Sequence, residues 1–345
     1  MSAAVESIVA DTGATGGRPG GGRRHATLLR AVPAVVVLVL LAAAPFVLAP
    51  FATTVLGRIL VFALFAVSLD LLVGVTGLPS LGHAAYFGVG AYTAGIVAID
   101  VTSEGVVLVL VAALAGAVAA AATGWLAVRS SGVFFLMLTL AVGEIVFQLT
   151  TTLDSVTGGS NGLYGIPAVR VGGTALTLAG YVYWFVLAVF VLGFAALWLV
   201  SRSPVGGVLR GIRDNEPRMR SLGYSPFRYK YVAFVIAGAL AGVAGGLFAL
   251  QVRLVTPSEA GFTTGALALL AVILGGAGSL WGPVLGAAVV VLVRDALGPT
   301  LEGHGPLVLG IVFVLAVYLL PRGFAGLAGI SAAVQRRRAA TRRTP

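Results

Sequence analysis

Long apolar segments dominate the chain, and each is separated from the next by a polar or glycine- and proline-containing connection. Most of them have about 20 residues, the length that an α-helix needs to cross the hydrocarbon core of a bilayer. The segments at 264–277 and 283–297 are shorter and meet at a Gly/Pro-rich joint, so they form either two tilted helices or one hairpin that does not cross fully. The pattern predicts ten crossings, at 31–51, 54–74, 79–99, 106–127, 132–152, 179–200, 231–251, 264–277, 283–297 and 306–321.

The composition agrees with an all-α polytopic membrane protein. The chain is 59% hydrophobic and 10% charged, whereas a soluble domain has about 25% charged residues. Its 48 glycines suit helices whose backbones approach closely in lipid. The lack of cysteine excludes disulfides and thiolate metal sites, and three histidines give little support to any metal site. The net charge of +10 does not indicate nucleic acid as a partner, because the basic residues lie in loops beside apolar spans.

The distribution of basic residues predicts that both termini are cytoplasmic. With the N-terminus inside, ten crossings place 18 of the 22 Lys and Arg residues on the inner side, as expected of cytoplasmic loops. The basic start before 31–51 resembles a signal peptide, but the length of this segment and the span that follows at once favour an uncleaved helix. We therefore expect a disordered cytoplasmic tail at 1–30, a transmembrane domain at 31–325 and a basic cytoplasmic tail at 326–345.

The loop 201–230 carries nine formal charges, seven of them basic, and must therefore project into water. Ser203 is a good N-cap for a short helix that ends near Arg213. A second helix is predicted to begin at 214–216 and to stop at Gly223, a residue typical of helix C-termini. A loop that only fixed the topology would need neither helix, so we interpret this one as a docking element for a cytoplasmic partner.

The chain has no recognisable catalytic or nucleotide-binding motif. Its single lysine, Lys230, follows Tyr229, whereas a P-loop requires Gly-Lys-Ser/Thr. If ATP drives this protein, ATP is bound by another chain. A Ser/His pair for an intramembrane hydrolase could be assembled, but no serine lies in a nucleophile elbow. We expect no enzymatic activity and no cofactor on the chain itself.

Polar residues inside the apolar spans are the candidates for a transport path. A carboxylate within a span usually faces a cavity or a partner, so Glu144 either lines the path or forms a structural pair with Arg129 or His83. His83 is either a hydrogen-bonded structural residue or, with Glu144, part of the relay of an ion-coupled transporter. Tyr86 and Tyr92 either line a cavity or pack in the core.

The segment 157–167, TGGSNGLYGIP, is predicted to face outward. The backbone amides around Asn161 could bind an anionic group such as a carboxylate. The segment could also receive a soluble binding protein, or it could be a plain connection of the kind that Gly and Asn favour.

Several stretches together resemble the branched-chain amino acid ABC transporter permeases of the LivM type. They are RGIRDNEPRMRSLGYSPFRYKYVAFVIAGALAGVAGGLFAL in the central loop and the helix after it, SLGHAAYFGVGAYTAG at 80–95, GGAGSLWGPVLGA at 275–287, MLTLAVGEI and TGGSNGLYGIP. The resemblance covers roughly residues 50–325.

This resemblance implies a multi-pass permease subunit of the bacterial inner membrane that imports branched-chain amino acids. Urea or short amides are the alternative substrates. The implied partners are a second homologous permease in a heterodimer, two ABC ATPases that bind the ATP, an extracytoplasmic substrate-binding protein and membrane lipid. The ATPases would dock on the central loop through Arg213, Asp214, Asn215, Glu216, Arg220, Leu222 and Gly223.

Overall fold

The computed structural model describes residues 22–297 and a few positions between 307 and 324. The chain divides into two units, Met1–Val47 and Leu48–Pro345. Three predicted segments lie wholly or mostly outside the described residues. They are the tail at 326–345, residues 1–21 of the N-terminal tail and most of the span 306–321.

The first unit contains one described helix, α2 (Gly22–Val47). This helix begins within the segment 1–30 that the sequence predicts to be disordered, so the prediction is wrong for residues 22–30. The physical reason is local, because the glycine-rich run ends at Gly22 and the residues after it include Arg, Ala and Leu, which are strong helix formers.

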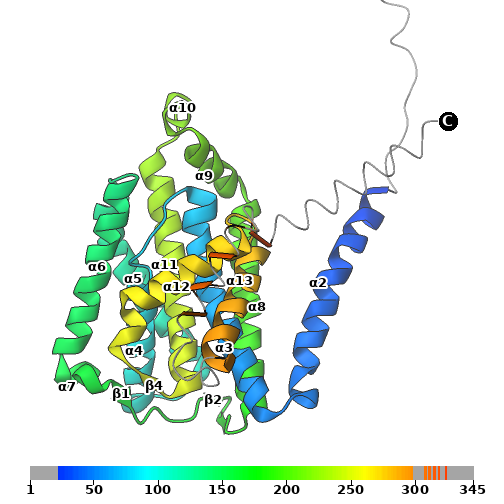
Figure 1. Cartoon of the computed structure of the whole chain (residues 1–345), viewed down its shortest axis with the longest axis vertical. Helices are drawn as coiled ribbons and strands as arrows, with labels where there is room; N and C mark the ends of the chain where they lie inside the picture. The colour runs from blue at the N-terminus through cyan, green and yellow to red at the C-terminus, as the bar shows by residue number, and fades with distance from the viewer. Residues whose placement is uncertain are drawn as a thin grey trace, which may run out of the picture. The chain divides into compact units, whose positions relative to one another are not determined.

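The second unit is a helical bundle whose elements follow the predicted segments (Figure 1). Helix α4 begins at Ala84, later than the predicted start at 79. Gly77, with φ 75°, ends the preceding helical run, and Pro79 lies in the non-helical connection between the two helices. The long elements are α3 (Pro50–Asp70) with the π-helical turn η1 (Leu71–Thr76), α4 (Ala84–Asp100), α5 (Gly105–Ala127), α6 (Val133–Thr152), α8 (Ala179–Arg202), α11 (Pro226–Val252), α12 (Phe262–Gly275), and α13 (Trp281–Val291) with η4 (Leu292–Leu297).

Five described segments are long and apolar enough to cross a membrane, judged by length and composition. They are Pro50–Thr76, Gly105–Ala127, Val133–Thr152, Ala179–Arg202 and Pro226–Val252, and shorter apolar helices include α4 and α12. The chain is therefore an all-α membrane protein with several spans, while the number of ten crossings and the location of the termini stay predictions.

The short elements lie at the two ends of this bundle (Figure 1). One end carries the charged loop, which folds into α9 and α10. The other end carries the small β-ribbons, and residues 163–164 pair there antiparallel with residues 254–255. The short elements are α7 (Asp154–Thr157), η2 (Gly159–Asn161), β1 (Leu163–Tyr164), β2 (Arg170–Val171), β3 (Thr174–Ala175), α9 (Pro204–Asp214), α10 (Glu216–Ser221), β4 (Leu254–Val255) and η3 (Pro257–Ala260).

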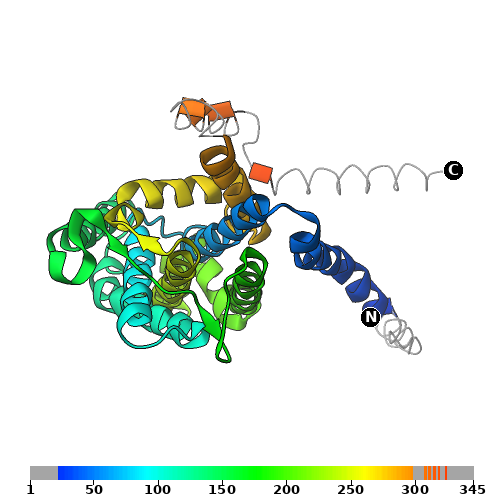
Figure 2. The same ribbon diagram turned by 90° about the horizontal axis from the view of Figure 1, so that it is seen from below.

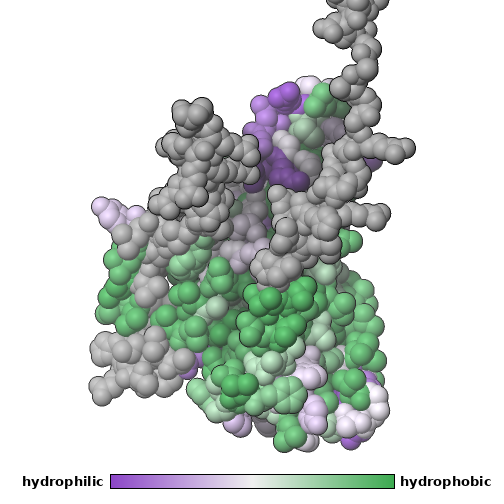
Figure 3. All heavy atoms as spheres, turned by 90° about the vertical axis from the view of Figure 1, so that its right-hand side faces the viewer, coloured by the Kyte–Doolittle hydropathy of each residue, from purple (hydrophilic) through white to green (hydrophobic). Residues whose placement is uncertain are grey.

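Helix α11 forms the centre of the bundle and packs against α3, α4 and α5 (Figure 2). Hydrophilic residues gather at the end that carries α9 and α10, and hydrophobic residues cover most of the coloured surface away from it (Figure 3). This distribution is the one expected of a bundle whose flanks face lipid and whose charged loop faces water.

Glycines allow α11 to approach α4 and α5 at backbone distance. A methyl group on Gly242 of α11 would overlap the carbonyl oxygen of Ala112 and lie 3.0 Å from the Cα of Gly116, both in α5. A methyl group on Gly90 of α4 would overlap the backbone of Gly242 from the other side. Since lipid supplies no hydrophobic driving force between helices, this close van der Waals contact is a main source of their association.

We predict that Gly242→Ala destabilises the bundle by about 1–3 kcal/mol, because the added methyl group forces α11 away from α5. The measurement is the thermal unfolding midpoint of the purified protein in detergent. Gly207→Ala in α9 is the matched control, since a methyl group there meets nothing within 4 Å, and we expect an unchanged or slightly higher midpoint. Equal midpoints for the two variants would contradict the close-packing role of Gly242.

Candidate functional site

The charged loop folds as two capped helices because its sequence satisfies the free backbone groups at their ends. The Oγ of Ser203 accepts a hydrogen bond from the Gly206 N–H (3.4 Å) at the start of α9. The Oδ1 of Asn215 accepts one from the Arg218 N–H (3.0 Å) at the start of α10. Gly223 follows α10 with φ 87°, a conformation that favours glycine. The predicted two-helix element is confirmed.

Ion pairs attach α10 to the membrane helix that follows it. Glu216 accepts hydrogen bonds from Lys230 Nζ (2.6 Å) and from Arg220 Nη2 (2.7 Å). Lys230 is buried, where an unpaired charge would be costly, and Glu216 supplies the opposite charge. Partial burial alone would raise the pKa of the Glu216 carboxyl, but the hydrogen bonds and charges of Lys230 and Arg220 outweigh it and hold the pKa below its ordinary value of 4.5.

Arg213 attaches α9 to the end of the first long membrane helix of the bundle. Its Nη1 donates a hydrogen bond to the Gly74 carbonyl oxygen in η1, and its Nε donates to Asp214 Oδ1 (3.0 Å). The side chain also lies over Gly77, where an added Cβ would be 2.6 Å from the Arg213 Cγ. A movement of α9 would therefore displace η1 directly.

The same end of α3 is attached to the connection between α12 and α13. Asp70, the last residue of α3, is fully buried, and its Oδ1 accepts a hydrogen bond from the Gly278 N–H (2.7 Å). Gly276, Gly278 and Leu280 all have positive φ in this connection. Positive φ is uncommon for leucine and marks a backbone whose surroundings enforce its conformation. A continuous set of contacts thus runs from α9 to the α12–α13 connection, and we call it the coupling seam. It consists of Arg213, Gly74, Asp70 and Gly278.

The structure brings the seven predicted coupling residues together on α9, α10 and the turn that follows. Leu222 has 63% of its surface exposed although it is apolar, and Arg218 and Arg220 are exposed beside it on α10. A groove of about 420 Å³ adjoins this turn and includes Gly223 and Tyr224 in its lining. An exposed leucine next to basic side chains is typical of a docking surface, whereas the docking itself stays a prediction.

His83, Tyr86 and Tyr92 lie in the interior of the bundle. His83 Nε2 is 3.0 Å from Ser68 Oγ, and its ring is stacked on Phe65. The Tyr86 hydroxyl is 2.6 Å from Thr123 Oγ1. Tyr92 is buried in an apolar cluster, and its hydroxyl has no hydrogen-bond partner among the described residues. These positions agree with the structural interpretation of His83 rather than with a relay.

Glu144 is exposed on α6, and the predicted structural pair with Arg129 or His83 is wrong. In the described part of the chain no cationic side chain lies within ion-pair distance of its carboxylate. The Arg129 guanidinium instead lies 4.5 Å from the centre of the Trp125 ring. Asn161, in η2, is also exposed. This turn connects α7 to β1, and both elements lie at the opposite end of the bundle from α9 and α10 (Figure 1).

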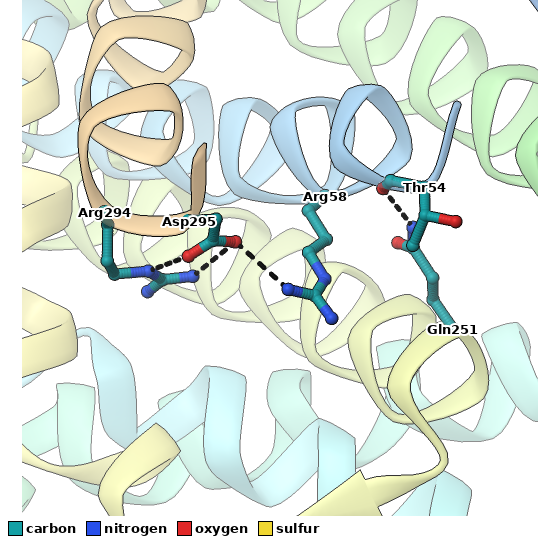
Figure 4. Close-up of polar contacts among 5 residues, drawn as sticks. All are labelled: Thr54, Arg58, Gln251, Arg294 and Asp295. Carbon is teal, nitrogen blue, oxygen red and sulfur yellow. Dashed lines mark hydrogen bonds and ion pairs between the residues drawn. The ribbon is translucent and has the colours of Figure 1, made fainter. Parts of the chain in front are cut away.

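A cluster of charges near the β-ribbon end was not predicted from the sequence. Asp295 accepts hydrogen bonds from Arg294 (2.7 Å) and from Arg58 (3.4 Å), and Gln251 donates to the Thr54 carbonyl oxygen (2.9 Å) (Figure 4). These contacts join α3, α11 and η4 across the apolar bundle. Arg58 and Asp295 are 237 positions apart, so no local pattern could have paired them. Asp70 also gave a signal in the sequence, because an aspartate within an apolar helix indicates a structural or functional role.

Among the described residues, no three His, Asp or Glu side chains come together in a way that could hold a metal ion.

Comparison with known proteins gives consistent matches over most of the chain. Residues 51–320 match the family model described as branched-chain amino acid transport system / permease component. The high-affinity branched-chain amino acid transport system permease protein LivM of Salmonella typhimurium is 31% identical over 83% of this chain and 72% of its own length. The protein of the same name from Escherichia coli K12 is 30% identical over 84% and 73%, and BraD of Pseudomonas aeruginosa is 25% identical over 77% and 91%. No solved structure matches the chain significantly.

We predict that the Glu216 ion pairs protect α10 in a pH-dependent way. Because the pKa of Glu216 is lower in the folded chain, the stability that its ionised carboxylate gives is present above about pH 4.5 and is lost as the pH falls through the folded value. The measurement is amide hydrogen exchange of residues 215–224 in the wild type and in Glu216→Gln at each pH, so that intrinsic exchange rates cancel.

The wild type should exchange more slowly than Glu216→Gln at pH 7, and this difference should decline as the pH falls below 4.5 and through the lower pKa of the folded chain. Residues in the middle of α11 serve as the internal control and should exchange equally in both proteins. Equal exchange of residues 215–224 in the two proteins at pH 7 would show that the ion pairs do not hold α10.

Proposed function

The chain belongs to the family of branched-chain amino acid transport permeases, and we propose that it carries branched-chain amino acids across the bacterial inner membrane as the LivM-type subunit of an importer. Members of this family are membrane subunits of ABC importers and are not enzymes. By the same proposal the chain pairs with a second, related permease and receives its substrate from an extracytoplasmic binding protein. Two separate ATPases bind and hydrolyse the ATP.

The two-helix element α9–α10 is the observation that carries the coupling part of this proposal. It is capped at both helix starts, has an exposed leucine and basic side chains on α10, and is joined through Arg213 to Gly74. In the proposed orientation it lies in the cytoplasm, where an ATPase would receive it in a groove. Closure of the two ATPases would then displace α9 and, through the seam, α3 and the α12–α13 connection.

The exposed face of α6 supports a transport path between two permease subunits. Glu144 and Gln148 are four residues apart, so they lie on the same face of this helix, and both are exposed. A carboxylate in the middle of a membrane span costs several kcal/mol when it faces lipid. We therefore propose that this face meets water or the second permease, and that Glu144 lines the path.

The competing functions find less support in the geometry. Ser68 and His83 form a hydrogen-bonded pair, but both side chains are fully buried and so cannot reach a substrate as a hydrolase would require. Glu144 and His83 would form the relay of an ion-coupled carrier, yet one is exposed and the other is buried against Ser68. Urea and short amides remain the alternative substrates for the importer itself.

Reconstitution of the chain with its partner permease, the two ATPases and the binding protein tests the proposed function. Proteoliposomes should accumulate labelled leucine only with internal ATP and external binding protein. Uptake of urea or acetamide in place of leucine would favour the alternative substrates. Leucine uptake that needs an ion gradient and no ATP would overturn the proposal.

Arg213→Gln should uncouple ATP hydrolysis from transport, because it removes a charged hydrogen bond between α9 and η1. Such a bond contributes about 1.5–3 kcal/mol, so we expect leucine uptake to fall roughly tenfold while ATP hydrolysis continues. Arg129→Gln removes the same charge from a residue whose guanidinium lies over aromatic rings of α5 and α11, and it should retain uptake. Equal uptake by the two variants would exclude Arg213 as the link.

Glu144→Gln should reduce leucine uptake roughly tenfold with unchanged assembly, since the glutamine keeps the size of the side chain and loses its charge. Asp100→Asn is the control, because Asp100 is an exposed carboxylate at the end of α4 rather than within a long span. Uptake and the amount of assembled complex are measured together for both variants. Normal uptake by Glu144→Gln would remove this residue from the path.

A further inference from the structure

A pocket of about 340 Å³ lies at the α9–α10 end of the bundle, and its lining extends beyond the residues of the coupling seam. Its walls come from the last turn of α8, from α9, from η1 and from the connection between α12 and α13. A volume of this size can hold a small polar ligand or headgroup. The pocket therefore needs an occupant whose chemistry its walls define.

The walls carry three arginines: Arg202, Arg210 and Arg213. Arg210 Nη1 donates to the Ser201 carbonyl oxygen (2.7 Å), and the Arg202 guanidinium lies 4.5 Å from the centre of the Trp198 ring. Within the described part of the chain, neither Arg202 nor Arg210 has a carboxylate at ion-pair distance. Guanidinium groups with free N–H donors in a pocket favour an anion, and phosphate above all.

The nearby acidic residues do not neutralise these two arginines. Asp214 is exposed and accepts its hydrogen bond from Arg213. Asp70 is buried and accepts from the Gly278 N–H. Neither aspartate lines the pocket. A net positive charge thus remains at the position where α8 ends.

An aromatic stripe adjoins this pocket and is formed by Phe194 and Trp198 of α8 and Trp281 of α13. Phe194 and Trp198 are four residues apart on α8, and Arg202 follows Trp198 at the same spacing, so all three lie on one face of the helix. Phe194 contacts Trp281 of α13, with ring centres 4.7 Å apart. Tryptophan is enriched at the level of lipid headgroups, and both Trp198 (38% exposed) and Trp281 (48% exposed) face outward beside the arginines.

We propose that this pocket binds an anionic phospholipid, with Arg202 and Arg210 holding the phosphate and the aromatic stripe receiving the acyl chains. A soluble anion would need the arginines but not the apolar stripe. A docked protein would meet the tip of the element first, where Arg218, Arg220 and Leu222 are exposed. Basic pockets at the cytoplasmic ends of membrane helices are suited to such headgroups. The lipid would brace α8 and α9 against the α12–α13 connection.

Native mass spectrometry of the delipidated full-length chain in detergent tests this proposal. The protein is titrated with dioleoyl-phosphatidylglycerol and, separately, with dioleoyl-phosphatidylcholine, which has the same acyl chains and no net charge. We expect one tightly bound phosphatidylglycerol and a weaker, non-saturating binding of phosphatidylcholine. Arg202→Gln should weaken the tight binding roughly fivefold, the effect of one basic residue near a lipid headgroup.

The matched control is Arg129→Gln, since Arg129 also lies 4.5 Å from the centre of a tryptophan ring and does not line this pocket. This variant should bind phosphatidylglycerol as the wild type does. Equal losses of phosphatidylglycerol affinity in Arg202→Gln and Arg129→Gln would overturn the assignment of the pocket to a lipid. Arg210 also donates a hydrogen bond to the Ser201 backbone, so its replacement could disturb the fold. The double variant Arg202→Gln/Arg210→Gln is therefore used only if its unfolding midpoint matches that of Arg202→Gln. It should then bind phosphatidylglycerol more weakly than Arg202→Gln does.

Two additional arms separate the sources of the anion. Millimolar inorganic phosphate or glycerol phosphate should not displace the bound phosphatidylglycerol; displacement would point to a soluble anion and overturn the lipid assignment. Addition of the ATPase subunits should also leave the lipid bound. Its release by the ATPases would identify the pocket as part of their docking surface instead.

Discussion

The hydrogen bonds from Arg213 to Gly74 and from Gly278 to Asp70 are the interactions on which the α9–α10 end of the bundle depends. Both exist because the helical backbone is irregular there. The π-helical turn η1 and the glycine-containing connection after α12 leave backbone groups that a regular helix would satisfy itself. In a membrane protein such groups must find partners within the protein. Here the partners are the side chains of an arginine and an aspartate from other parts of the chain.

Local rules were sufficient to predict the elements of this end but not its connections. Ser203, Asn215 and Gly223 could be interpreted from the sequence because capping depends on residues three or four positions apart. The bond between Arg213 and Gly74 spans 139 positions, and that between Gly278 and Asp70 spans 208. Nothing in a local pattern specifies which helices become neighbours, so these contacts were not predictable.

The dependence on long-range contacts also explains why one of the two alternatives for Glu144, the structural pair with Arg129 or His83, was wrong. A carboxylate within an apolar segment requires a polar environment, and the sequence offered Arg129 and His83 as nearby candidates. Each of these is instead engaged with another side chain, Arg129 with Trp125 and His83 with Ser68. The requirement for a polar environment is thereby moved outside this single chain. The exposed face of α6 is consistent with a subunit that is complete only in an assembly.

The two helices of the coupling element differ in how firmly they are attached, and this difference bears on how force would pass through them. Helix α9 buries Leu209 and Ile212 against the bundle and adds the Arg213 bond, so it moves with the membrane helices. Helix α10 buries no residue; it is attached through the ion pair of Glu216 with Lys230 and through Met219, which lies against Gly211 of α9. Ion pairs at a partly exposed site are weaker than burial of two aliphatic side chains, which contributes roughly 1.5–3 kcal/mol each. Helix α10 can therefore adjust to the surface of a partner, while α9 transmits the displacement to η1 and α3. A lipid headgroup held between α8 and α9 would make the transmission from α9 to η1 and α3 more rigid. It would leave α10 free to adjust to the partner.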